Sequence, residues 1–287
     1  MRFPRPFCRL LLAAVIAGAG VAAPDAADAQ TTLGRIREEG KVRIAIAGEA
    51  PYGYRNAEGE VTGEAPEIAR AVLNRIDPAI EIEWVETEFG QLIPGLQAGD
   101  FDIAAAGMFI TPERCEEVAF SNPTYVIGEA LAVRKGNPKE LTDFETISAR
   151  NDAKVGLIAG TVEYNYALVT GIPGDRALLY SNFDKAIEAL KEGEVDAVAL
   201  TSLTAKDLVE GEPDLEATSQ FYPMLDGLEV KGYGGFAFRR EDEALRQAFN
   251  QQLDSFLGSE EHWSLVEPFG FTPEMAPEMT AQVLCAD

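Results

Sequence analysis

Residues 96–125, LQAGDFDIAAAGMFITPERCEEVAFSNPTY, combine an apolar run with a lone arginine at a spacing that suits the binding of a small anion. The run Phe-Asp-Ile-Ala-Ala-Ala closes on Gly107, which is typical of a parallel strand buried on both faces. In open α/β sheets, ligands bind beyond the carboxyl ends of the strands. Phe109, Thr111 and Arg114 follow this strand directly. The segment therefore predicts an anion clamp formed by Arg114.

Arg114 also has a purely structural explanation. Pro112 favours the first turn of a helix, and on such a helix Arg114 could pair with Glu113 or Glu117 on a solvated face. Composition alone does not separate the two interpretations, whereas an internal repeat favours the clamp.

The chain repeats itself weakly. Residues 89–107 and 183–201 share a frame of Phe, Leu, Gly and Asp positions. Each segment reads as a helix, a glycine stop and a buried strand. Repeats this short can arise by chance, so a second pair in the same order matters.

The second pair is residues 41–49 and 154–161, in which a strand runs into Ala-Gly and then a polar residue. If the alignment of the two segments allows a gap of one residue, Glu49 and Thr161 occupy equivalent positions at strand ends. Two similar α/β lobes would then contribute similar edges to one cleft.

We therefore predict an α/β fold of two similar lobes with mixed, mostly parallel sheets and a hinge of two crossovers. Lobe 1 is expected to comprise residues 30–126 and 235–287, and lobe 2 residues 127–234. The crossings are expected near 126–130 and 230–235. Three glycines in the second crossing would allow unusual backbone angles and a hinge rotation; a loop without motion is the alternative.

The sequence after the second crossing predicts a strand and then an amphipathic helix over residues 241–257. The Pro-rich stretch 267–287 is expected to pack as an extended tail.

The N-terminus predicts export. Three arginines precede the apolar run 10–23, and residues 27–29 give the small-x-small pattern of a signal peptidase site. The run is too short to span a membrane. We expect a cleaved signal peptide over residues 1–29 and a soluble periplasmic product.

Composition excludes several function classes. The formal net charge of −24 makes nucleic acid and anionic lipid poor partners. His262 is the only histidine and no Cys-x-x-Cys occurs, so neither a zinc site nor a catalytic triad is expected. We also expect no other metal and no cofactor. Cys115 and Cys285 could form one disulfide in an oxidising compartment.

Several segments, in order, resemble the family 3 extracellular solute-binding proteins of ABC importers, the polar amino acid class. They are GKVRIAIAGEAPYGY, GEAPEIA, GLQAGDFDIAAAGMFITPER, AFSNPTY, AVRKGNP, VGLIAGT and GYGGFAFRRED. The resemblance implies a type II periplasmic binding fold and a monomer. It also implies delivery of a small solute to membrane permease and ATPase subunits.

The resemblance also assigns roles. In that family the arginine matching Arg114 clamps the ligand carboxylate, helped by groups matching Thr111 and Thr161. An aromatic matching Tyr52 covers the ligand. The acid that usually holds the α-ammonium is replaced here by Thr201, which argues against an ordinary α-amino acid.

Glu49, Tyr52, Phe89 and Phe109 would surround the cationic end of a ligand with one carboxylate and three aromatic faces, which suits a delocalised cation. Plain core packing is the alternative for each aromatic. This set resembles the members of the family that bind ectoine and hydroxyectoine, whose ligand has a carboxylate and a cyclic amidinium. Glu49 would hold the amidinium, and Arg114 the carboxylate. The expected ligand-binding residues are Glu49, Tyr52, Phe89, Gly107, Phe109, Thr111, Arg114, Thr161 and Thr201.

The expected function is high-affinity periplasmic binding of ectoine or hydroxyectoine. A polar or basic amino acid, or another carboxylate-bearing solute, would use the same frame. A dehydratase-like enzyme with Glu49 as general acid is the third alternative. No His or Lys occupies a matched cleft position, so we expect no enzymatic activity.

Overall fold

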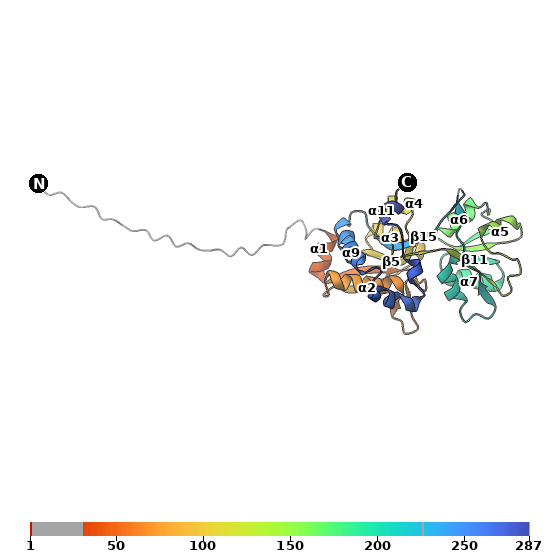
Figure 1. Ribbon diagram of the computed structural model, residues 1–287, viewed down its shortest axis with the longest axis horizontal. Helices are drawn as coiled ribbons and strands as arrows, with labels where there is room; N and C mark the ends of the chain where they lie inside the picture. Colours follow the sequence, from red (N-terminus) through yellow and green to blue (C-terminus); the bar gives the residue numbers. More distant parts are fainter. Residues whose placement is uncertain (2–30, 226, 287) are drawn as a thin grey trace.

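The computed structural model describes residue 1, residues 31–225 and residues 227–286. Apart from Met1, the predicted signal peptide therefore lies outside the described residues. The described chain forms two α/β lobes that lie side by side along the long axis of the molecule (Figure 1). None of the helices in the described chain combines the length and apolar character needed to cross a membrane.

Lobe 1 contains a mixed six-stranded sheet of order β4-β1-β5-β15-β6, in which β7 also pairs with β15. Its strands are β1 (Lys41–Ile46), β4 (Glu81–Glu86), β5 (Ile103–Phe109), β6 (Ala119–Phe120), β7 (Tyr125–Ile127) and β15 (Gly232–Phe238), with a small hairpin of β2 (Tyr54–Arg55) and β3 (Val61–Thr62). Its helices are α1 (Thr32–Glu39), α2 (Glu64–Ile76), α3 (Leu92–Ala98), α4 (Pro112–Glu117), α9 (Glu243–Phe256), α10 (Glu260–Val266) and α11 (Ala281–Leu284), with 3-10 turns η2 (Phe89–Gln91), η3 (Glu267–Phe269) and η4 (Pro273–Met275).

Lobe 2 contains a five-stranded sheet of order β10-β9-β11-β8-β12. Its strands are β8 (Glu129–Arg134), β9 (Val155–Ile158), β10 (Ala177–Tyr180), β11 (Ala197–Thr201) and β12 (Leu215–Ala217), with a hairpin of β13 (Met224–Leu225) and β14 (Leu228–Glu229). Its helices are α5 (Phe144–Ala149), α6 (Glu163–Val169), α7 (Phe183–Glu192) and α8 (Ser202–Val209).

The weak sequence repeat corresponds to a repeat of topology. In lobe 1, β4, β1 and β5 run parallel and β15 joins β5 antiparallel; in lobe 2, β10, β9 and β11 run parallel and β8 joins β11 antiparallel. The helix before each inner strand ends at a left-handed glycine, Gly99 (φ 77°) or Gly193 (φ 76°). The fold class predicted from the sequence is therefore confirmed.

The chain passes from sheet to sheet between β7 and β8 and again before β15. The glycines of the second passage serve another purpose than predicted. Gly232 and Gly234 lie within β15 and outside the left-handed backbone region. A Cβ atom on Gly232 would lie 2.0 Å from the ring of Phe109, and one on Gly234 would lie 2.1 Å from the ring of Tyr125. These glycines make room for aromatic rings, so the prediction of unusual backbone angles is wrong.

Two further details differ from the sequence predictions. Strand β5 continues past Gly107 to Phe109, although Gly107 has φ 64°. The C-terminal stretch is not extended, because η3, η4 and α11 fold it into short helical turns. Its prolines start the two 3-10 turns, where a missing N–H group costs nothing.

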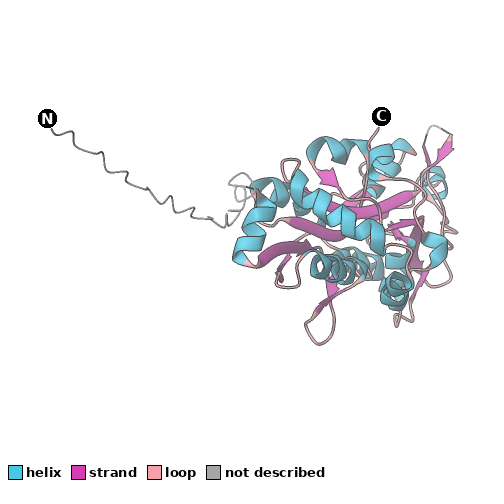
Figure 2. Cartoon of the chain, turned by 60° about the vertical axis from the view of Figure 1, so that its left-hand side comes forward, coloured by secondary structure: helices cyan, strands magenta, loops and turns pink. Residues whose placement is uncertain are grey.

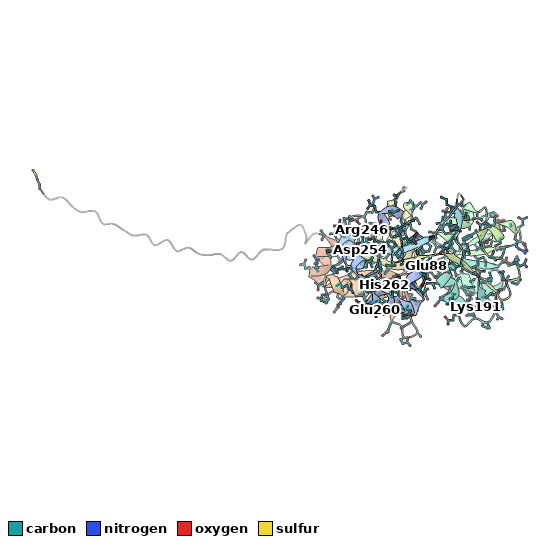
Figure 3. The ribbon with its side chains drawn as sticks, viewed as in Figure 1. Glu88, Lys191, Arg246, Asp254, Glu260 and His262 are labelled. Atoms are coloured by element: carbon teal, nitrogen blue, oxygen red, sulfur yellow. A yellow bond between two sulfur atoms is a disulfide. The ribbon has the colours of Figure 1, made fainter. Side chains whose placement is uncertain are left out.

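Helices cover both faces of the lobe 1 sheet (Figure 2). The apolar side of α2 packs on one face of β5 and α3 packs on the other, while α9 packs beside α2 with Phe249 against Phe236 and Phe238 of β15. Figure 3 labels His262 in lobe 1 and Lys191 in lobe 2. His262 is buried beside Phe256 and Trp263.

Cys285 at the end of α11 forms a disulfide with Cys115 of α4. This bond ties the C-terminus to the helix that carries Arg114.

Candidate ligand-binding cleft between the lobes

A small cavity lies between the lobes where β1, β5, β9 and β11 end. It is lined by Glu49, Phe89, Gly107, Phe109 and Arg114 from lobe 1 and by Ile158, Thr161, Val162, Glu163, Phe183, Leu200 and Thr201 from lobe 2. All predicted ligand-binding residues except Tyr52 and Thr111 are in this set. The cavity volume is about 20 Å³, roughly the space for one water molecule. Hydrogen bonds from Arg114 to the Gly160 carbonyl and from Tyr52 to Thr201 hold the lobes together at this cavity.

Arg114 links the two lobes. It is 9% exposed, and its Nη1 donates to the Phe109 carbonyl at 2.7 Å while Nη2 donates to the Gly160 carbonyl of lobe 2 at 2.8 Å. Its guanidinium lies 5.6 Å from the centre of the Phe89 ring. Thr111 accepts a hydrogen bond from the Arg114 N–H and caps α4, so it positions the arginine and does not line the cavity.

These contacts decide between the two explanations of Arg114 that the sequence left open. Both side-chain hydrogen bonds go to carbonyl oxygens, and none goes to Glu113 or Glu117 of its own helix. Burial lowers the pKa of the Arg114 guanidinium, although an arginine stays charged in any protein environment. The structure therefore presents a buried cation to the cleft.

Glu49 is buried, with 6% exposure, and ends a chain of hydrogen bonds that crosses between the lobes. The Tyr52 hydroxyl donates to Thr201 at 3.0 Å, Thr201 donates to Thr204 at 3.0 Å, and Thr204 donates to Glu49 at 2.7 Å. Burial raises the pKa of Glu49 to about 8. A cation in the cleft would stabilise its ionised form.

Tyr52 lies behind the cavity wall and does not form it. Its ring packs 5.1 Å from that of Tyr125 and edge-on to Phe271 at 5.6 Å. A Cβ atom on Gly107 would lie 2.6 Å from the Tyr52 ring, so glycine is required for this approach. Of the three predicted cage rings, the cavity lining contains Phe89 and Phe109.

Five residues of the cavity lining were not predicted from the sequence: Ile158, Val162, Glu163, Phe183 and Leu200. Phe183 begins α7, as Phe89 begins the η2 turn that leads into α3, so the repeat contained the signal for it. Glu163 lines the cavity and Glu129 begins β8; they are 5% and 1% exposed. Burial is the main cause that raises the pKa of both carboxyl groups, and the charge of Glu163 raises that of Glu129 further.

Residues 42–271 match the family model for bacterial extracellular solute-binding proteins, family 3. The chain belongs to this family. It is also 36% identical, over 97% of its length and 90% of the relative's, to the probable amino-acid ABC transporter periplasmic-binding protein y4tE of Sinorhizobium fredii.

Solved structures agree with this assignment. A crystal structure of EhuB in complex with hydroxyectoine superposes with a TM-score of 0.81 at 36% identity, covering 90% of this chain and 98% of EhuB. The ancestral amino acid-binding protein AncCDT-1, a precursor of cyclohexadienyl dehydratase, gives a TM-score of 0.72 at 26% identity, covering 83% and 99%.

Family membership makes this chain an extracytoplasmic solute-binding protein of an amino-acid-type ABC transporter, with a small molecule as its ligand. The fold is that of the type II periplasmic binding proteins. The family and these relatives are binding proteins, which agrees with the prediction of a solute-binding protein of an ABC importer.

Proposed function

We propose that the protein binds ectoine or hydroxyectoine in the cleft between its lobes and delivers it to the permease and ATPase subunits of an ABC importer. It would act as a periplasmic monomer after removal of residues 1–29. One observation carries the proposal: the buried groups Arg114 and Glu49 line a single cavity together with the rings of Phe89 and Phe109.

A zwitterion supplies a partner for each of these buried groups. Its carboxylate would accept hydrogen bonds from the Arg114 N–H groups that the protein leaves unused. Its cation would face Glu49, whose pKa burial raises to about 8 and which a nearby positive charge would favour in its ionised form. The faces of Phe89 and Phe109 attract a delocalised, weakly hydrated cation such as an amidinium.

Thr201 supports this ligand class over ordinary α-amino acids. The residue is uncharged, and its hydroxyl is already engaged with Tyr52 and Thr204. The similarity to EhuB, which was solved with hydroxyectoine, favours the same class. Binding is proposed without catalysis because the described residues that line the cavity include no Lys or His to act as a base.

A polar or basic amino acid is the second candidate, and Glu163 is the observation that favours it. This buried carboxyl group lines the cavity from lobe 2. It could bind an α-ammonium group in place of the acidic residue that other family members have at the position of Thr201.

A thermal-shift panel on the intact, solute-free protein separates the two candidates, because a ligand that binds only the folded state raises the midpoint of unfolding. We expect ectoine or hydroxyectoine to give a larger rise than arginine or glutamine. The Thr201→Asp variant should reverse the order, because it restores an acid for an α-ammonium. A larger shift with an amino acid in the wild type would refute the proposed ligand.

A further inference from the structure

Glu163 is the first residue of α6 and lines the same cavity as Glu49 and Arg114. It is 5% exposed, and its Oε2 atom has no hydrogen-bond partner in the described part of the chain. A buried carboxyl oxygen without a donor is costly and rare in folded proteins. Apart from a hydrogen bond shared with the Glu129 carboxyl group, the donor that such a buried group needs would come from a bound solute.

Glu129 lies behind Glu163. It begins β8 opposite Thr201 of β11, it is 1% exposed, and its own Oε2 atom is also without a partner among the described residues. Burial raises the pKa of Glu129, and the charge of Glu163 and a hydrogen bond between the two carboxyl groups raise it further. The hydrogen bond with Glu129 therefore orients the Glu163 carboxyl group, and a hydrogen bond from Thr161 and the charge of Arg114 favour its ionised form.

A structural explanation of Glu163 is weaker. An acid in the first turn commonly stabilises a helix through its dipole, but such an acid needs no burial and no carboxyl neighbour. A metal site is also unsupported, since no group of three or more His, Cys, Asp or Glu side chains within the described ranges is arranged to hold an ion. Burial in the cleft wall with an unsatisfied oxygen points to a ligand.

We propose that Glu163 is a second cation contact in the cleft and accepts an N–H group of the solute, with Glu129 as the residue that positions it. The solute class is then a carboxylate-bearing cation with N–H groups that point in different directions, as in a cyclic amidinium or a guanidinium. Glu49 receives one N–H group and Glu163 another. The inference rests on the cleft of the proposed function, but not on ectoine as its ligand.

Calorimetric titration of the full-length processed protein with ectoine and with arginine tests this assignment. Glu163→Gln should weaken binding of the preferred ligand at least tenfold. The matched control is Glu188→Gln, an exposed acid of α7 in the same lobe, which should leave the affinity unchanged. Glutamine has the shape of a protonated glutamate, so the unfolding midpoint of ligand-free Glu163→Gln should stay close to that of the wild type.

Glu129 provides a second, independent variant. Glu129→Gln should weaken binding less than Glu163→Gln, and the double variant should bind as Glu163→Gln does, because Glu129 acts only through Glu163. Additive losses in the double variant would contradict the positioning role.

Affinity of Glu163→Gln within twofold of the wild type would overturn the proposal. If the wild type prefers arginine to ectoine, the proposed function fails, whereas a tenfold loss of arginine affinity in Glu163→Gln would still support the second cation contact.

Discussion

Replacing Arg114 by alanine should weaken ligand binding by about two to four orders of magnitude. Nη1 and Nη2 each donate one hydrogen bond, to the carbonyl oxygens of Phe109 and Gly160. Each of these nitrogens carries two N–H groups, so one on each remains for a solute carboxylate. Hydrogen bonds to charged groups contribute about 1.5–3 kcal/mol each, so two contribute roughly 3–6 kcal/mol. A factor of ten in affinity corresponds to about 1.4 kcal/mol.

The assay is isothermal calorimetry with ectoine on solute-free protein. Arg114→Lys keeps the charge but loses the paired N–H geometry, so we expect a loss smaller than that of Arg114→Ala. The control is Arg240→Ala, which removes an exposed arginine that donates to the Glu116 carbonyl. An affinity of Arg114→Ala within threefold of the wild type would refute the carboxylate clamp.

Three other predictions concern packing, pH and the disulfide. Gly232→Ala places a Cβ atom 2.0 Å from the Phe109 ring, so it should cost about 1–3 kcal/mol of stability and weaken binding in calorimetry, whereas Gly174→Ala, in open space, should change neither. Burial raises the pKa of Glu64 to about 7, so its stabilising contribution is complete below its unfolded value near pH 4.5 and is lost as pH rises through 7. Urea unfolding should show a loss of up to about 3 kcal/mol by pH 9 that is absent in Glu64→Gln; equal pH profiles would contradict this. Cys285→Ser should lower the free energy of unfolding by about 3–5 kcal/mol, and mass mapping that finds two free thiols in the wild type would exclude the bond.

The topology of the two lobes could be predicted because the signals of the repeat lie within short segments of the sequence. The stops at Gly99 and Gly193 and the apolar strands that follow are visible without any tertiary contact. The glycines of β15 were misread for the opposite reason. Gly232 and Gly234 accommodate Phe109 and Tyr125, which are more than a hundred residues away in the sequence, and only the folded sheet brings them together.

The residues of the candidate site likewise fall into those that local sequence signals predict and those that only the folded chain reveals. Glu49, Thr161 and Arg114 could be predicted because each follows a strand, and strand ends of an α/β sheet meet at one edge. Glu163 begins a helix, where an acid is ordinary, so nothing in the sequence signals its burial. The position of Tyr52 behind the cavity depends on rings from distant segments, which pack against it in the folded chain.

We expect the cleft to select a carboxylate-bearing cyclic amidinium over α-amino acids, including arginine with its delocalised guanidinium. The most direct test is a calorimetric competition on wild-type protein that has been unfolded and refolded to remove bound solute, titrated with ectoine in the presence of excess arginine or glutamine. We expect ectoine or hydroxyectoine to bind at least tenfold more tightly than either amino acid. Tighter binding of any standard amino acid than of ectoine would contradict it.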